Sequence, residues 1–154
     1  MIEEIIIREL NKSESPPYEL LLSADPKIEL VKEYIARGRV FVSQYENEIV
    51  GIYVLIKTRP ETLEIVNIAV KESCQGKGIA KKMIADAKIR AKEMGVRSIE
   101  IGTGNSSINQ LILYQKCGFK ITGIDIDFFT RHYENTIIEN EIACTDMIRL
   151  KFDI

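Results

Sequence analysis

Residues 70–80 read VKESCQGKGIA, a short polar loop with two glycines. The segment before it, residues 63–70, is rich in β-branched side chains and predicts a strand. The segment after it, residues 79–94, has apolar side chains at helical spacing and predicts an amphipathic helix. Glycines at such a junction let the backbone turn its N–H groups toward one point, where the helix adds its unpaired amides and positive dipole end. The stretch therefore predicts an anion-binding loop and a phosphorylated ligand.

Composition and charge limit the classes of protein to which the chain can belong. Its 154 residues are 45% hydrophobic, which is enough for one core, so we expect a single domain over residues 1–154. The net charge of −2 argues against a general nucleic-acid binder. Residues 71–97 carry eight basic and three acidic side chains, whereas residues 124–154 carry three and seven. This asymmetry suits a polyanionic cofactor beside a cationic substrate, although a solvated helix face would look the same.

The sequence also bears on location and metal binding. No apolar run is long enough to cross a bilayer, and Glu3 and Glu4 stand where a signal peptide would carry basic residues. The three cysteines, Cys74, Cys117 and Cys144, are scattered and accompany a single histidine, which indicates neither a disulfide framework nor a zinc site. We expect a cytoplasmic protein without a bound metal and without a membrane partner.

The order of the remaining segments predicts an α+β protein. A strand over residues 3–10 precedes a short helix ending near Leu22 and a second helix that stops at Gly38. An antiparallel hairpin follows at 40–45 and 49–57, then a strand at 98–102 and a helix opened by a capping box at Ser107. Two further strands are expected at 119–126 and 147–152, the last at the edge of the sheet. Residues 127–143 show no clear period and fit either a long loop or a hairpin.

Two motifs in register resemble those of a known enzyme family. QGKGIA at residues 75–80 resembles the Gln/Arg-x-x-Gly-x-Gly/Ala signature of the GCN5-related N-acetyltransferases (GNAT), and LYQKCGF at residues 113–119 resembles their second hallmark. The match covers residues 63–119. The resemblance implies the GNAT fold, an α/β (α+β) arrangement with a mixed, mostly antiparallel central sheet splayed into a V and about four flanking helices. The chain lacks the Gly-Lys-Ser/Thr of a nucleoside triphosphatase and the Gly-x-Gly-x-x-Gly of a dinucleotide fold.

The same resemblance implies acetyl-coenzyme A as the phosphorylated ligand. Its pyrophosphate is expected on the backbone of the glycine loop, at Gln75, Gly76, Lys77, Gly78, Ile79 and Ala80. The pantetheine arm is expected in the V-shaped slot, paired with the backbone of Ile68, Ala69 and Val70. A backbone N–H near Ile68 or Ala69 is a candidate donor to the oxyanion of the tetrahedral intermediate. Asn105 and Asn109 either contact the pantetheine or cap a helix.

Three side chains are candidates for acid–base chemistry. The family places a tyrosine at the position of Tyr114, where its phenol can protonate the departing thiolate; alternatively its ring only packs in the core. Relatives use a glutamate on the bulged strand, or ordered waters, to deprotonate the amine. Glu64 is the candidate on that strand, unless it is an exposed carboxylate with no role. His132 lies in an aromatic-rich segment that could line a binding site, or it is simply exposed.

The expected reaction is transfer of an acetyl group to a primary amine of a small molecule or peptide. Cys74 and Cys117 adjoin the motifs, but the resemblance favours direct attack in a ternary complex over a cysteine intermediate. The acidic residues near the C-terminus favour a cationic acceptor. A non-catalytic acyl-coenzyme A-binding sensor or interaction subunit is the alternative, and transfer to oxygen or of longer acyl chains stays open. A homodimer joined through the final strand is also compatible with this fold.

Overall fold

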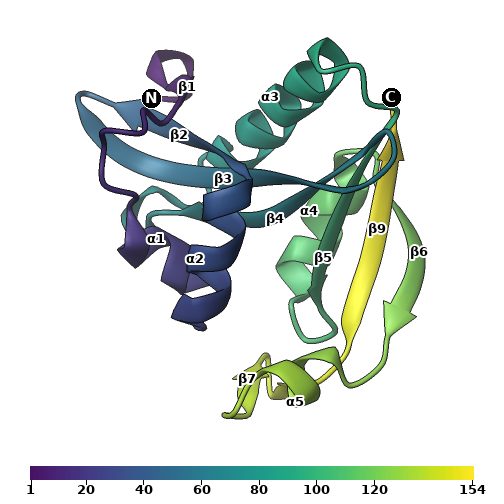
Figure 1. The fold of residues 1–154 in the computed structure, drawn as a ribbon. Helices are drawn as coiled ribbons and strands as arrows, with labels where there is room; N and C mark the ends of the chain where they lie inside the picture. Colours follow the sequence, from purple (N-terminus) through teal and green to yellow (C-terminus); the bar gives the residue numbers. More distant parts are fainter.

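The computed structural model describes all of residues 1–154, and its central feature is a seven-stranded sheet with the order β1-β2-β3-β4-β5-β9-β6 (Figure 1). Only β4 and β5 run parallel; every other neighbouring pair is antiparallel. The strands of this sheet are β1 (Ile6–Glu9), β2 (Arg39–Tyr45), β3 (Glu48–Arg59), β4 (Thr62–Val70), β5 (Ser98–Gly104), β6 (Lys120–Asp125) and β9 (Met147–Asp153). A separate hairpin is formed by β7 (Ile137–Glu139) and β8 (Ile142–Cys144).

Helices cover both faces of the sheet. They are α1 (Tyr18–Ala24), α2 (Ile28–Arg37), α3 (Ile79–Glu93), α4 (Ile108–Lys116) and α5 (Phe128–His132). The larger core cluster joins α3 and α4 to one face of the sheet, and a smaller one joins α1 and α2 to the other. Because both of its faces are buried, β3 is a nearly continuous apolar run. Tyr53 and Leu55 pack in the larger cluster, and Ile52 and Val54 pack in the smaller one.

The predicted strand–loop–helix unit is present at β4–α3. Helix α3 begins after Gly78, which has a positive φ of 86°, and ends before Gly95, which has a φ of 75°. Its buried stripe includes Met83, Ile84 and Ala87. The helix therefore fixes the glycine loop against the sheet through its own apolar face.

The sheet opens between its two parallel strands. Strand β4 pairs with β5 only from Thr62 to Ile65, after which the strands diverge. The register between β3 and β4 shifts at Val54/Leu55, so that Val66 has no partner and forms a bulge. The splayed, mostly antiparallel sheet confirms the predicted fold class, with five α-helices where about four were expected.

Two local predictions were wrong, and a third was confirmed only in part. Strand β9 is not at the edge of the sheet but lies between β5 and β6, so its edge is not open to a second copy of the chain. Ser107 precedes α4 but forms no capping bond, because its hydroxyl donates to Glu139 Oε1 at 3.0 Å instead. In residues 127–143 the hairpin alternative is confirmed in part: the β7–β8 hairpin begins at Ile137, and helix α5, which was not predicted, precedes it.

Candidate active site

The loop before α3 presents a row of free backbone donors. Gly76 and Gly78 both have positive φ values, 74° and 86°. The side-chain amide of Gln75 donates to the carbonyl oxygen of Val70 at 3.0 Å and fixes the start of the loop. No backbone amide from Gly76 through Lys81 donates a hydrogen bond within the protein. Because these N–H groups surround one helix N-terminus, the loop fits a phosphate or pyrophosphate group.

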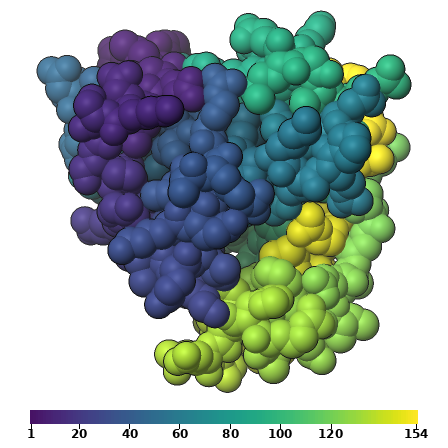
Figure 2. Space-filling view, in the orientation of Figure 1, coloured from purple at the N-terminus to yellow at the C-terminus, as the bar shows by residue number.

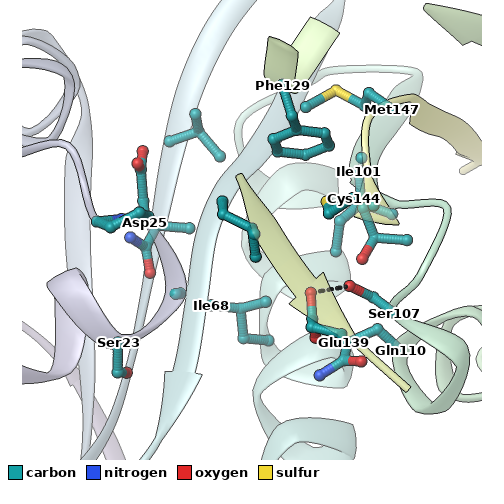
Figure 3. Close-up of a pocket in the computed structure, with 18 of the residues that line it drawn as sticks. Ser23, Asp25, Ile68, Ile101, Ser107, Gln110, Phe129, Glu139, Cys144 and Met147 are labelled. Atoms are coloured by element: carbon teal, nitrogen blue, oxygen red, sulfur yellow. Dashed lines mark hydrogen bonds between the residues drawn. The ribbon is translucent and has the colours of Figure 1, made fainter. Parts of the chain in front are cut away.

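A cavity of about 550 Å³ opens where β4 and β5 separate. It is lined by residues 65–68 of β4, residues 101–104 of β5, the α1–α2 loop, α4, and the segment from α5 to β9. In Figure 3, Ser23 and Asp25 lie on one side of the cavity, and Ser107, Gln110 and Glu139 lie on the other. The cavity thus separates the N-terminal helices from the C-terminal part of the chain.

Tyr114 reaches this cavity from α4. The residue is 4% exposed and its ring packs 6.4 Å from that of Phe119. Burial raises the pKa of its phenol well above the ordinary value, and the hydroxyl has no hydrogen-bond partner in the protein. The phenol is therefore protonated at neutral pH and free to donate to a group inside the cavity.

The two predicted bases lie outside the cavity. The carboxylate of Glu64 pairs with Arg149 at 3.2 Å, and its burial raises its pKa. His132 is exposed at the end of α5, with its ring 4.6 Å from that of Phe128. The structure brings neither side chain next to Tyr114.

Of the residues predicted on β4 and near α4 to contact the cofactor, some line the cavity and others pack in the core or hold neighbouring backbone. Ile68 lines the cavity, whereas Ala69 and Val70 pack on opposite faces of the sheet. The side chain of Asn105 accepts hydrogen bonds from the backbone amides at 145 and 146 and donates to the carbonyl oxygen at 143. It therefore fixes the start of β9, while Asn109 is exposed on α4.

The cysteines give no candidate nucleophile. Cys74 is buried and Cys117 is half-buried, and neither lines the cavity. Cys144 lines it, but burial raises the pKa of this thiol and so disfavours the reactive thiolate. No cluster of three or more His, Cys, Asp or Glu side chains could hold a metal ion, and no helix is long and apolar enough to cross a membrane.

The sequence did not reveal a polar cluster on the cavity wall around Asp25. Tyr133 Oη donates to Asp25 Oδ1 at 2.8 Å, and Tyr34 Oη donates to Oδ2 at 3.1 Å. Asn67 Nδ2 in turn donates to Tyr34 Oη at 2.8 Å. Nearby, Lys27 Nζ donates to the carbonyl oxygen of His132 at 2.8 Å. In Figure 2 the surface of the segment around Asp25 and α2, in blue, contacts the surface of the segment after α5, in yellow-green.

Only the composition of these segments hinted at that cluster. The aromatic-rich segment around His132, from Phe128 to Tyr133, was a candidate to line a binding site. Nothing in the local pattern links Asp25 to Tyr133, because 108 residues separate them.

Comparison with known proteins identifies the family. Residues 5–119 match the model of the acetyltransferase (GNAT) family. The chain is 58% identical over 137 residues to the uncharacterized N-acetyltransferase YvbK of Bacillus subtilis, covering 89% of this chain and 88% of that protein.

Two solved structures share the whole fold. A GNAT family acetyltransferase from Elizabethkingia anophelis, solved with acetyl-CoA bound, is 45% identical with a TM-score of 0.97 over 99% of both chains. A Bacillus subtilis acetyltransferase solved in complex with CoA is 53% identical with a TM-score of 0.93, covering 97% of this chain and 99% of that one. With its free amide loop and split sheet, this chain belongs to the acetyltransferase (GNAT) family, enzymes that take their acetyl group from acetyl-CoA.

Proposed function

We propose that the protein transfers the acetyl group of acetyl-CoA to a primary amine of a small molecule or peptide, by direct attack in a ternary complex. The observation that carries this proposal is the position of Tyr114, whose free phenol lines the cavity formed where β4 leaves β5. Strand β4, which lines the same cavity, continues into the amide loop, so the anion site adjoins the cavity that Tyr114 reaches from α4. A protein that only bound acyl-CoA would not require that donor.

The cofactor side of the site is formed by backbone groups. The free amides from Gly76 through Lys81 bind the pyrophosphate, and the edge of β4 from Ile68 to Val70, which has no strand partner toward β5, pairs with the pantetheine arm. When bound, acetyl-CoA supplies an acyl carbon activated as a thioester. A backbone N–H near Ile68 or Ala69 donates to the carbonyl oxygen as negative charge develops there.

Tyr114 completes the reaction. The neutral amine forms the new N–C bond, the C–S bond breaks, and the phenol gives its proton to the departing sulfur. The proton lost by the amine passes to solvent water, since neither Glu64 nor His132 lines the cavity. Solvent then returns a proton to Tyr114. The raised pKa of Cys144, the thiol that lines the cavity, favours this direct route over an acetyl-cysteine intermediate.

Release of free CoA thiol in the presence of a panel of primary amines tests the reaction. Initial rates at several concentrations of both substrates should give intersecting lines in double-reciprocal plots; parallel lines would indicate a covalent intermediate. Tight binding of acetyl-CoA with no turnover of any amine would instead establish the non-catalytic binder.

Replacing Tyr114 with phenylalanine tests the proton donor. We expect Tyr114→Phe to lower kcat about 100-fold and to change the KM for acetyl-CoA much less, because general acid catalysis contributes factors of about 10²–10⁴. Tyr45→Phe removes a phenol on β2, outside the cavity, and is the matched control. An unchanged kcat in Tyr114→Phe removes Tyr114 from the mechanism.

A further inference from the structure

The charged side chains that line the cavity are all acidic. Asp25 and Glu139 are its only charged side chains, and no lysine, arginine or histidine lines it. Glu139 is fixed on one wall by Ser107 at 3.0 Å, and Asp25 lies on the opposite wall (Figure 3). Such a lining lowers the local potential and excludes anionic acceptors.

The carboxylate of Asp25 is held in one orientation. Two phenols donate to it, Tyr133 at 2.8 Å and Tyr34 at 3.1 Å, and the backbone N–H of Lys27 donates to Oδ1 at 3.2 Å. Tyr34 must direct its hydrogen at Asp25 because it accepts one from Asn67 Nδ2. A carboxylate has about four lone-pair positions, so this one can accept a further donor from the cavity.

Asn67 supplies a second acceptor that nothing in the protein uses. The residue is 4% exposed and lines the same cavity. Its Nδ2 donates to the carbonyl oxygen of Leu21 at 3.0 Å and to Tyr34, and because a carbonyl can only accept, the orientation of the amide is settled. Oδ1 is then left buried with no hydrogen-bond partner. Buried acceptors are nearly always paired, so this one points to a donor that arrives with a ligand.

We propose that Asp25 and Asn67, beside the ring of Tyr133, bind a second ammonium group of the acceptor, so that the substrate is an aliphatic diamine. This inference rests on the proposed acetyl transfer. The nitrogen that attacks must be neutral, and so the charge that Asp25 recognises has to sit on another nitrogen of the same molecule. An ammonium group offers three N–H donors and a positive charge, which match a carboxylate and a free amide oxygen.

A pair of acceptors tests the idea on the unmodified protein. Butane-1,4-diamine and 4-aminobutan-1-ol have similar length, and each carries a primary amine that can be acetylated. At the other end, the diamine carries an ammonium group and the amino alcohol carries a hydroxyl. We expect kcat/KM for the diamine to exceed that for the amino alcohol about 10- to 100-fold, the range of a charge-assisted hydrogen bond. The diamine has two equivalent reactive amines and the amino alcohol has one, and this statistical factor accounts for only about twofold of the difference.

Asp25→Asn keeps the shape of the side chain and removes its charge. We expect this variant to lose about 10- to 100-fold in kcat/KM for the diamine, mainly through KM, and to leave the amino alcohol nearly unchanged. Glu29→Gln makes the same change on an exposed residue in the first turn of α2 and is the matched control, expected to alter neither acceptor. The amino alcohol rate and the affinity for acetyl-CoA show whether the variant is folded.

The outcomes separate this inference from the one on which it depends. Turnover of both amines with no preference for the diamine overturns the diamine site and leaves acetyl transfer standing. An equal loss for both acceptors in Asp25→Asn, with acetyl-CoA binding intact, makes Asp25 a structural residue and also overturns it. Binding of acetyl-CoA without turnover of any amine overturns the proposed function itself.

Discussion

Replacing Gly76 with alanine measures the anion loop separately from the stability of the fold. Gly76 has a φ of 74°, and a Cβ built there would have no heavy atom within 4 Å. Gly95, at the far end of α3, has a φ of 75° and is equally open. The two alanine variants therefore carry the same backbone strain and no steric clash within the protein, and they differ in their distance from the free amides.

The expected size of each effect follows from that geometry. A side chain in the left-handed region costs roughly 1–2 kcal/mol, so both variants should lose that much unfolding free energy, and their melting temperatures should fall by a similar few degrees. Only Gly76→Ala disturbs the free amides that we propose bind the pyrophosphate. Loss of one charge-assisted hydrogen bond, about 1.5–3 kcal/mol, raises the Kd for CoA about 10- to 100-fold.

Thermal unfolding and calorimetric titration with CoA provide the two measurements. We expect similar melting temperatures for the two variants and weaker CoA binding for Gly76→Ala alone. If both bind CoA as the unmodified protein does, the pyrophosphate does not rest on the amide at Gly76. If both bind it more weakly, strain in α3 rather than local geometry controls affinity.

Three further outcomes can be checked. Asn105→Ala should lower the unfolding free energy by about 1–3 kcal/mol, because backbone groups at 143, 145 and 146 lose their partners, while the exposed Asn109→Ala should stay within about 0.5 kcal/mol in the same denaturant titration. The pH profile of kcat should show no loss from ionisation of Tyr114 up to about pH 10, because burial raises its pKa; a fall near pH 8 with that origin would contradict the assignment. The hydrogen bond from Arg8 lowers the pKa of Glu14 from 4.5 to about 2, so its contribution to stability is complete above pH 4.5 and is lost as the pH falls toward 2. Glu14→Gln should therefore flatten the acid limb of the stability profile between those values, by a small amount because solvent reaches both side chains, and an unchanged limb would show that the pair adds nothing.

Local pattern was sufficient where neighbouring residues determine the structure. The alternation of β4, the glycines after it and the apolar stripe of α3 each follow from short-range chemistry, and the helix begins and ends at glycines with positive φ. The position of β9 could not be read in this way, because a strand's place in a sheet depends on which partners it meets rather than on its own sequence. Helix α5, only five residues long, is too short for a helical period to show.

The site was predictable to the extent that it is built from backbone and motif. The amide loop and Tyr114 each lie in a short continuous motif, so the residue types in the sequence were enough to predict an anion loop and a proton donor. The wall around Asp25 joins side chains from α2, β4 and the end of α5, and no local pattern predicts that meeting. The predicted capping box at Ser107 is absent for the same reason, which is a contact distant in sequence: the Ser107 hydroxyl donates to Glu139, 32 residues away.

The contacts between the two ends of the chain have a consequence for the order of folding. Lys27 meets His132 and Asp25 meets Tyr133 across 105 and 108 residues, whereas the amide loop is complete within a dozen positions of its strand. Closing so large a loop of chain is slow compared with forming a local turn, so the cavity wall around Asp25 should be among the last parts to assemble. We therefore expect the amide loop to form earlier during folding than the cavity wall around Asp25.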